Sequence, residues 1–191
     1  MLDGGYRFDD WNDRDANWAS YASSPAAVVV NLLSIGGTGN SGSGTASDGF
    51  GGTDTLLRIS AIVGSAFNDT LLGSAAFLGE TFEGGAGNDS IDGGAFLEQL
   101  GLNNRQVNQA RYASAPGAVQ VDLAQGSATG AAGNDRLVNI NAVMGSDFAD
   151  SLAGSNRSDQ VEYFWGGKGN DTIDGRGGFD VARYDLPGAT A

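Results

Sequence analysis

Two long stretches of the chain are near-copies of each other, and this repetition constrains the possible fold more than any other feature. Three pairs of segments correspond in sequence: residues 21–32 to 112–123, 52–74 to 133–155, and 82–94 to 164–176. Fixed self-similarity of this kind is typical of stacked architectures, in which each unit buries its apolar face against its neighbour. The sequence therefore predicts a stack of similar coils.

The repetition divides the chain into two long repeats. We expect the first repeat to span residues 1–94 and the second to span residues 95–191, with the start of a third copy at its end. Two insertions, 6–17 and 96–108, interrupt the repeats at equivalent points, and the first copy is longer around SGSGTASDGF, residues 41–50. Apolar residues at helical spacing before Gly101 predict one or two helical turns in the second insertion.

A smaller unit recurs inside each repeat, namely an aspartate followed two positions later by a large aliphatic residue. The pairs are Asp54/Leu56, Asp69/Leu71, Asp89/Ile91, Asp135/Leu137, Asp150/Leu152 and Asp171/Ile173. Residues two apart in a strand point to the same side, so each aliphatic side chain is expected to stack on its counterpart one coil away. The pattern predicts an all-β fold of short parallel strands joined by glycine-rich loops.

Composition narrows the possible functions. The chain has no cysteine and no histidine, which excludes disulfide scaffolds, cysteine- or histidine-based metal sites and histidine-dependent catalytic triads. It carries 23 acidic and 10 basic residues, a net charge of −13. Such a surface repels phosphate groups, so we expect neither nucleic acid nor an anionic membrane as a partner. No apolar run is long enough to span a membrane.

Two nonapeptides carry a recognisable chemistry. GGAGNDSID, residues 84–92, and GGKGNDTID, residues 166–174, follow the pattern Gly-Gly-x-Gly-x-Asp-x-aliphatic-x, which is typical of calcium-binding parallel β-helices. Ca²⁺ prefers six to eight oxygen ligands in a flexible geometry. Glycine-rich turns expose main-chain carbonyls and the aspartate adds a charged oxygen, so the pattern predicts that Ca²⁺ is the cofactor. Less complete copies occupy residues 64–72, 145–153 and 175–183.

In these nonapeptide motifs the chain resembles the RTX, or repeats-in-toxin, family of calcium-bound β-rolls. The resemblance covers most of the chain outside the two insertions. It implies a right-handed parallel β-roll or β-solenoid that folds on binding extracellular calcium. It also implies a place within a larger bacterial protein that is secreted by type I export or displayed at the cell surface, with adjacent repeats of that protein as partners.

The resemblance also implies a set of metal ligands, made of turn carbonyls and loop aspartates. In the two complete copies these are Gly84, Gly85, Gly87, Asp89, Gly166, Gly167, Gly169 and Asp171. In the less complete copies the candidates are Asp54, Asp69, Asp135, Asp150 and Asp180. Phe67 and Phe148 stand where the third motif glycine belongs, so Asp69 and Asp150 fit either a calcium site or a solvated turn.

Other acidic residues leave alternatives open. Glu80 and Glu162 fit either additional calcium ligands or a solvated strand edge. The segment from Asp13 to Asn17 begins like a helix–loop–helix calcium loop, but Trp18 stands at the position that requires glycine.

Two further function classes compete with a calcium-binding module. The insertions, residues 6–18 and 96–108, contain aromatic and polar residues that would suit an adhesion or carbohydrate-binding module, with a cell-surface glycan or protein as partner. Catalysis would depend on carboxylates such as Glu80 and Glu83, or on a metal-bound water. Because the recurring carboxylates are already explained by calcium or by solvation, we expect that the chain is not an enzyme.

Overall fold

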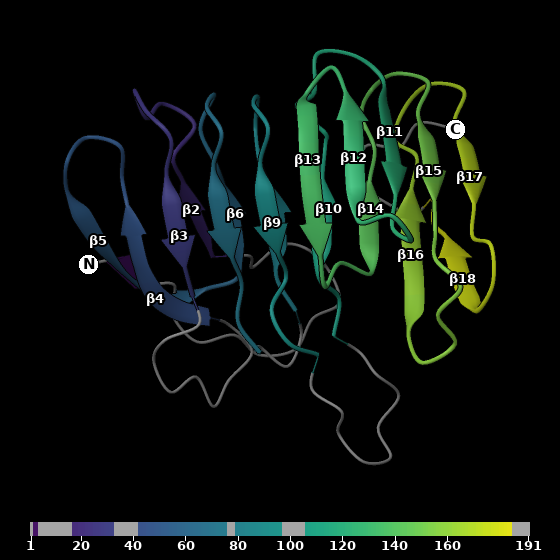
Figure 1. The fold of residues 1–191 in the computed structure, drawn as a ribbon, viewed down its shortest axis with the longest axis horizontal. Helices are drawn as coiled ribbons and strands as arrows, with labels where there is room; N and C mark the ends of the chain where they lie inside the picture. The colour runs from purple at the N-terminus through teal and green to yellow at the C-terminus, as the bar shows by residue number, and fades with distance from the viewer. Residues whose placement is uncertain (1, 4–16, 33–41, 76–78, 97–105, 185–191) are drawn as a thin grey trace.

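The computed structural model describes residues 2–3, 17–32, 42–75, 79–96 and 106–184, and within them it is all-β. The strands form two sheets, one behind the other in Figure 1, which both extend along the long axis of the molecule, with turns at the upper and lower edges. The predicted all-β fold class is therefore confirmed. No helix in the described part of the chain is long and apolar enough to cross a membrane.

The sheet that we call sheet B is built of parallel strands. Its order is β18-β16-β14-β10-β8-β6-β2, and every neighbouring pair is parallel. In chain order its strands are β2 (Trp18–Ser20), β6 (Ala61–Val63), β8 (Thr81–Glu83), β10 (Gln109–Arg111), β14 (Ala142–Met144), β16 (Val161–Trp165) and β18 (Phe179–Ala182). Most of these strands have only three residues, as the short repeating unit predicts.

The opposite sheet, sheet A, is mixed. Its order is β1-β5-β4-β3-β7-β9-β13-β12-β11-β15-β17. In chain order its strands are β1 (Leu2–Asp3), β3 (Val29–Asn31), β4 (Gly42–Ser47), β5 (Thr53–Ile59), β7 (Thr70–Leu72), β9 (Ser90–Asp92), β11 (Val119–Asp122), β12 (Ser127–Gly130), β13 (Gly133–Val138), β15 (Ser151–Ala153) and β17 (Thr172–Asp174). Parallel ladders run through β3-β7-β9-β13 and through β11-β15-β17.

Two antiparallel meanders interrupt the parallel pairing of sheet A. The meander β11-β12-β13 separates the two ladders, and the meander β3-β4-β5 lies at the end of the first ladder, next to β1. The prediction of a stack made only of parallel strands is wrong for these elements. The longer stretch of the first copy forms β4, whose alternate residues Gly42, Gly44 and Ala46 are buried. Because these residues are small, β4 packs closely on β3, and a side chain at Gly44 would collide with the main chain of Asn31.

The core lies between the two sheets and is made of stacked side chains. Leu71, Ile91 and Leu137 stand in register on consecutive parallel strands, as do Leu152 and Ile173. This confirms the predicted stacking for five of the six aliphatic residues, whereas Leu56 stands in register with Leu2 and Gly44. Sheet B contributes the facing side chains, which include the fully buried Ile62, Phe82, Ala110, Val143 and Phe164.

Most of both insertions lies outside the described residues. The helical turns expected within 96–108 fall almost entirely there, and so does nearly all of 6–17. The boundaries of the two repeats stay a prediction.

Candidate metal-binding turns

A column of aspartates runs along the upper edge of the molecule, where turns from sheet B lead into sheet A. Asp69 and Asp89 immediately precede β7 and β9, whereas Asp135 lies near the start of β13, after a turn from β12 of sheet A; β7, β9 and β13 are consecutive neighbours. Asp89 Oδ1 accepts the main-chain N–H of Asp69 at 2.8 Å, and Asp135 Oδ1 accepts that of Asp89 at 2.9 Å. Each carboxylate therefore braces the turn of the preceding coil.

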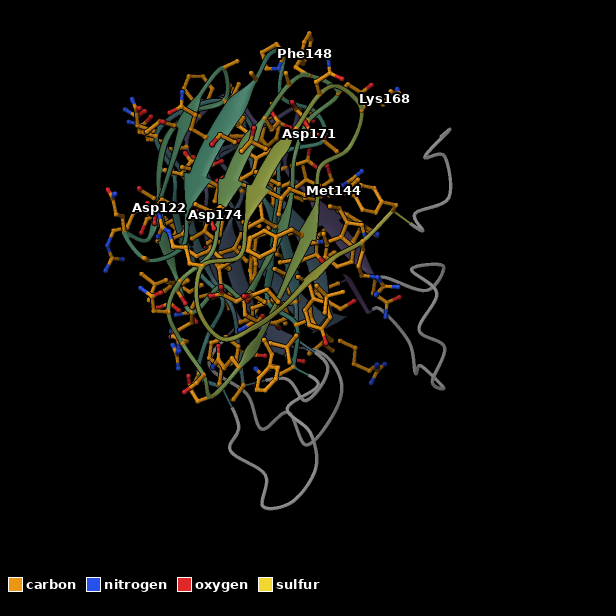
Figure 2. All side chains as sticks on the ribbon, turned by 90° about the vertical axis from the view of Figure 1, so that its right-hand side faces the viewer. Asp122, Met144, Phe148, Lys168, Asp171 and Asp174 are labelled. Atoms are coloured by element: carbon orange, nitrogen blue, oxygen red, sulfur yellow. The ribbon has the colours of Figure 1, made fainter. Side chains whose placement is uncertain are left out.

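A second column repeats this arrangement near the C-terminal end. Asp171 Oδ1 accepts the main-chain N–H of Asp150 at 2.9 Å, and Asp150 Oδ1 accepts that of Val119 at 2.8 Å. In the view along the stack, Phe148 and Lys168 lie at the upper end and Asp171 lies below them (Figure 2). Five of the predicted aspartates thus fall into two columns along one edge.

The glycines of the two complete nonapeptides adopt backbone conformations that side chains disfavour. Gly85 and Gly87 have φ values of 97° and 127°, and Gly167 and Gly169 have values of 93° and 106°. Residues other than glycine rarely adopt such angles. The motif therefore sets the path of the turn.

Main-chain carbonyl oxygens line the gap between successive turns. The carbonyls of Ser65 and Phe67 lie against Gly85 and Gly87 of the next coil. Those of Ser146 and Phe148 lie in the same way against Gly167 and Gly169. The described residues contain no cluster of three or more acidic side chains suited to a metal ion. A cation in these gaps would therefore depend mainly on main-chain oxygens, with the aspartate supplying charge.

The surroundings of Asp89 fit a bound cation most clearly. Its side chain is buried, and its Oδ2 atom has no hydrogen-bond partner. Burial, together with the charges of Asp135 and Asp69, raises the pKa of Asp89 to about 7. A buried carboxylate oxygen without a partner is costly, and a cation beside it would remove that cost. The residues at this turn therefore fit a bound Ca²⁺.

Asp69 and Asp150 are buried in a different setting. The Ser65 hydroxyl donates to Asp69 Oδ1 at 2.8 Å and its main-chain N–H donates to Oδ2. Ser146 makes the same two hydrogen bonds to Asp150. Both carboxylates are buried, so the structure does not place them in solvated turns.

The remaining two predicted aspartates on sheet A, Asp54 and Asp135, each accept a hydrogen bond from a tyrosine hydroxyl. Asp135 Oδ2 accepts the Tyr112 hydroxyl at 3.0 Å, and Asp54 Oδ2 accepts the Tyr21 hydroxyl at 3.3 Å. Burial, together with the charge of Asp135, raises the pKa of Tyr112, which keeps the hydroxyl protonated as a donor. Asp54 and Asp135 lie within β5 and β13 rather than in a loop.

One stacked turn was missed by the sequence analysis. Residues 130–135, Gly-Ala-Ala-Gly-Asn-Asp, link β12 to β13 and stack directly on the turn at 84–89, because Gly87 N–H donates to the Ala132 carbonyl at 2.9 Å. Gly133 has a φ of 133°, close to that of Gly87. The signal was present, because this segment departs from the first six positions of the motif only at Ala131.

Acidic residues of the lower edge form a separate group. Asp180 in β18 stands in register with Glu162 in β16, and its Oδ1 atom is buried without a hydrogen-bond partner. Burial, together with the charge of Glu162, raises the pKa of Asp180. Glu80 and Glu162 are both 2% exposed, so their interpretation as a solvated strand edge is wrong.

The comparison with protein families fits this geometry. A family model of the RTX calcium-binding nonapeptide repeat matches the chain in four copies, over residues 79–95 and 144–182. The chain contains RTX calcium-binding repeats. The matched ranges include the complete RTX turns at Asp89 and Asp171 and the less complete ones at Asp150 and Asp180. A comparison with curated proteins gave no match.

The loop-like motif in the first insertion falls outside this site. Asp13 and Asp15 are outside the described residues. Asn17, the last residue of that motif, donates from its side chain to the Arg58 carbonyl at 3.1 Å. Within the described residues, the candidate metal site therefore consists of the RTX turns.

Proposed function

We propose that the chain is a calcium-binding RTX repeat module that becomes ordered when it binds extracellular Ca²⁺ within a larger secreted protein. The observation that carries this proposal is Asp89 Oδ2, a buried carboxylate oxygen without a hydrogen-bond partner beside a gap lined by carbonyls. The family match supports the same ion.

The complete turns would hold the ions. Asp89 with Gly84, Gly85 and Gly87, and Asp171 with Gly166, Gly167 and Gly169, are the residues that would contribute carboxylate and main-chain oxygens. Ca²⁺ accepts this mixture because it tolerates irregular geometry. Extracellular calcium modules typically bind with dissociation constants of about 10⁻⁴ to 10⁻³ M, and we propose that this chain binds in that range.

Architecture and charge support ordering by calcium. We propose a right-handed β-roll whose parallel coils are interrupted by the two antiparallel meanders. At a net charge of −13 the metal-free chain repels itself. Bound Ca²⁺ would lower that repulsion and would also offset the cost of burying carboxylates. Such a mechanism suits a protein that stays unfolded until it meets calcium outside the cell.

The contacts of the candidate catalytic pair support a binding role rather than catalysis. Glu80 accepts hydrogen bonds from the main chain and hydroxyl of Ser74. Glu83 is buried and pairs with Arg111 at 3.2 Å, and it also accepts the Ser114 N–H at 3.0 Å. Both carboxylates are thus engaged in packing contacts. The adhesion alternative depends on the insertions, most of which lie outside the described residues.

Isothermal titration with calcium tests the proposal at Asp89. Asp89→Asn removes the charge at the unpartnered oxygen, and we expect it to weaken calcium binding at that site at least about tenfold, because an amide oxygen is a much weaker ligand for Ca²⁺. Asp147→Asn is the matched control, since Asp147 lies on the same edge but is exposed and paired with Lys168. It should leave binding unchanged. Equal binding by both variants and the wild type would contradict the proposal.

A further inference from the structure

Within the residues that the structure describes, four turns begin with Gly-Ser, and in each of them the serine holds the carboxylate that ends the turn. The serine hydroxyl donates to the carboxylate at 2.6–2.8 Å and the serine main-chain N–H donates to its second oxygen. The pairs are Ser65/Asp69, Ser74/Glu80, Ser146/Asp150 and Ser155/Glu162. We call this arrangement a serine clip.

Four other turns have a different backbone at the second position, whereas the turn at 130–135 belongs to neither group, because Ala131 has no positive φ and the Tyr112 hydroxyl donates to Asp135. In those four turns the second residue has a positive φ of 97° at Gly85, 81° at Gly94, 93° at Gly167 and 61° at Arg176. None of the four clip serines has a positive φ. In two of the turns without a clip, the ends carry the buried carboxylate oxygens without a partner, Asp89 Oδ2 and Asp180 Oδ1. Backbone conformation and carboxylate pairing therefore change together.

We propose that the second residue of each turn decides whether the turn binds calcium. This inference rests on the proposed function and specifies which turns carry it. A clip serine supplies two hydrogen-bond donors, which stabilise the carboxylate as a bound cation would. A turn with a clip therefore needs no metal ion, and we call it closed. Where the second residue has a positive φ, the carboxylate lacks these donors and the turn is open to Ca²⁺.

The hydroxyl also fixes the rest of the clip turn. Ser65 Oγ accepts the Phe67 N–H at 3.1 Å, and Ser146 Oγ accepts the Phe148 N–H at 3.1 Å. These phenylalanines stand where open turns have Gly87 or Gly169, both at positive φ. Conversion of a clip into an open turn therefore requires glycine at both the second and the fourth position.

Clips and open turns are neighbours along the upper edge. The clip at 64–69 precedes the open turn at 84–89, and the clip at 145–150 precedes the open turn at 166–171. The carbonyls of Ser65 and Ser146 face the glycines of those open turns. Each clip thus forms a metal-free wall of the adjacent calcium site. The chain should bind fewer ions than its four matched copies suggest, because the turn at Asp150 is closed.

The test counts bound calcium ions by equilibrium dialysis at saturating calcium. Ser146→Gly combined with Phe148→Gly should add one ion per chain, because it opens the clip at Asp150. Ser146→Ala keeps the clip backbone and loses only the hydroxyl, so it should lower the melting temperature without changing the ion count. Ser23→Gly, at an exposed position, controls for added backbone flexibility and should change neither quantity.

A reverse variant keeps the inference testable if the opened turn fails to fold. Gly167→Ser should remove one ion, since a side chain there would collide with the Ser146 carbonyl. An unchanged ion count in both the opened and the reverse variant, with a wild type that binds calcium, would overturn the inference alone. A wild type that binds no calcium would overturn the proposed function and this inference with it.

Discussion

At the scale of single residues, the molecule depends on how each buried carboxylate is compensated. Serine donors compensate Asp69 and Asp150, and a tyrosine hydroxyl compensates Asp135. Asp89 has only the N–H of Asp69 on one oxygen and nothing on the other. A charge left in that state is expensive in a buried position, which is why calcium is the partner we propose for Asp89.

Glu80 gives a prediction about pH. Burial raises its pKa from 4.5 to about 7, against the opposing hydrogen bonds from Ser74. The folded chain then keeps the Glu80 proton over a pH range in which the unfolded chain has lost it. The stability that the protonated Glu80 gives the folded chain is therefore lost as the pH rises from 4.5 to about 7. Glu80→Gln lacks this titration.

Melting temperatures of wild type and Glu80→Gln at saturating calcium measure the effect. Wild type should be more stable relative to the variant at about pH 5.5 than at about pH 8, by a few degrees. Because the two proteins share every other titrating group, the difference isolates Glu80. The same difference at both pH values would show that Glu80 does not titrate as described.

The motif alone could identify Asp89 and Asp171, because the glycines and the aspartate lie within six positions of each other. It set Asp69 and Asp150 apart only as less complete copies, because Phe67 and Phe148 replace a motif glycine, and it could not show how their carboxylates are held. The role of Ser65 depends on the direction of its main-chain N–H, and sequence does not report that direction. The contact of Asp135 with the Tyr112 hydroxyl could not be predicted either, because Tyr112 is far away in sequence and meets Asp135 only across the fold.

At the scale of elements, short strands are held by stacking rather than by their own length. A three-residue strand such as β9 forms few hydrogen bonds, so its buried side chain carries much of its stability. The stacking could be predicted from the spacing of aspartate and aliphatic residues. The meanders could not, because a stretch of glycine, serine, threonine and alanine reads as a loop until β3 and β5 are seen to enclose β4.

Substitutions at Ile91 test whether stacked side chains stabilise the short strands. It is 1% exposed and stacks between Leu71 and Leu137. Ile91→Ala should lower the free energy of unfolding by about 2–5 kcal/mol, whereas Ile91→Val should cost about 0.5–1.5 kcal/mol. Urea unfolding at saturating calcium measures both. Similar small losses for the two variants would mean that this position is not part of a tightly packed stack.

At the scale of the whole molecule, charge repulsion and a thin core both limit the stability of the fold. The net charge of −13 opposes compaction, and the core is only two short-stranded layers deep. The aspartate columns add further repulsion, because they place buried carboxylates one coil apart. Calcium opposes both effects at once, so the described fold should depend on it.

Far-ultraviolet circular dichroism during calcium titration and chelation tests this dependence most directly. In millimolar calcium the account predicts a β spectrum with a cooperative thermal transition. In EDTA it predicts that most of the β signal and the transition are lost and return when calcium is restored. An identical, cooperatively melting β spectrum in EDTA would contradict the account.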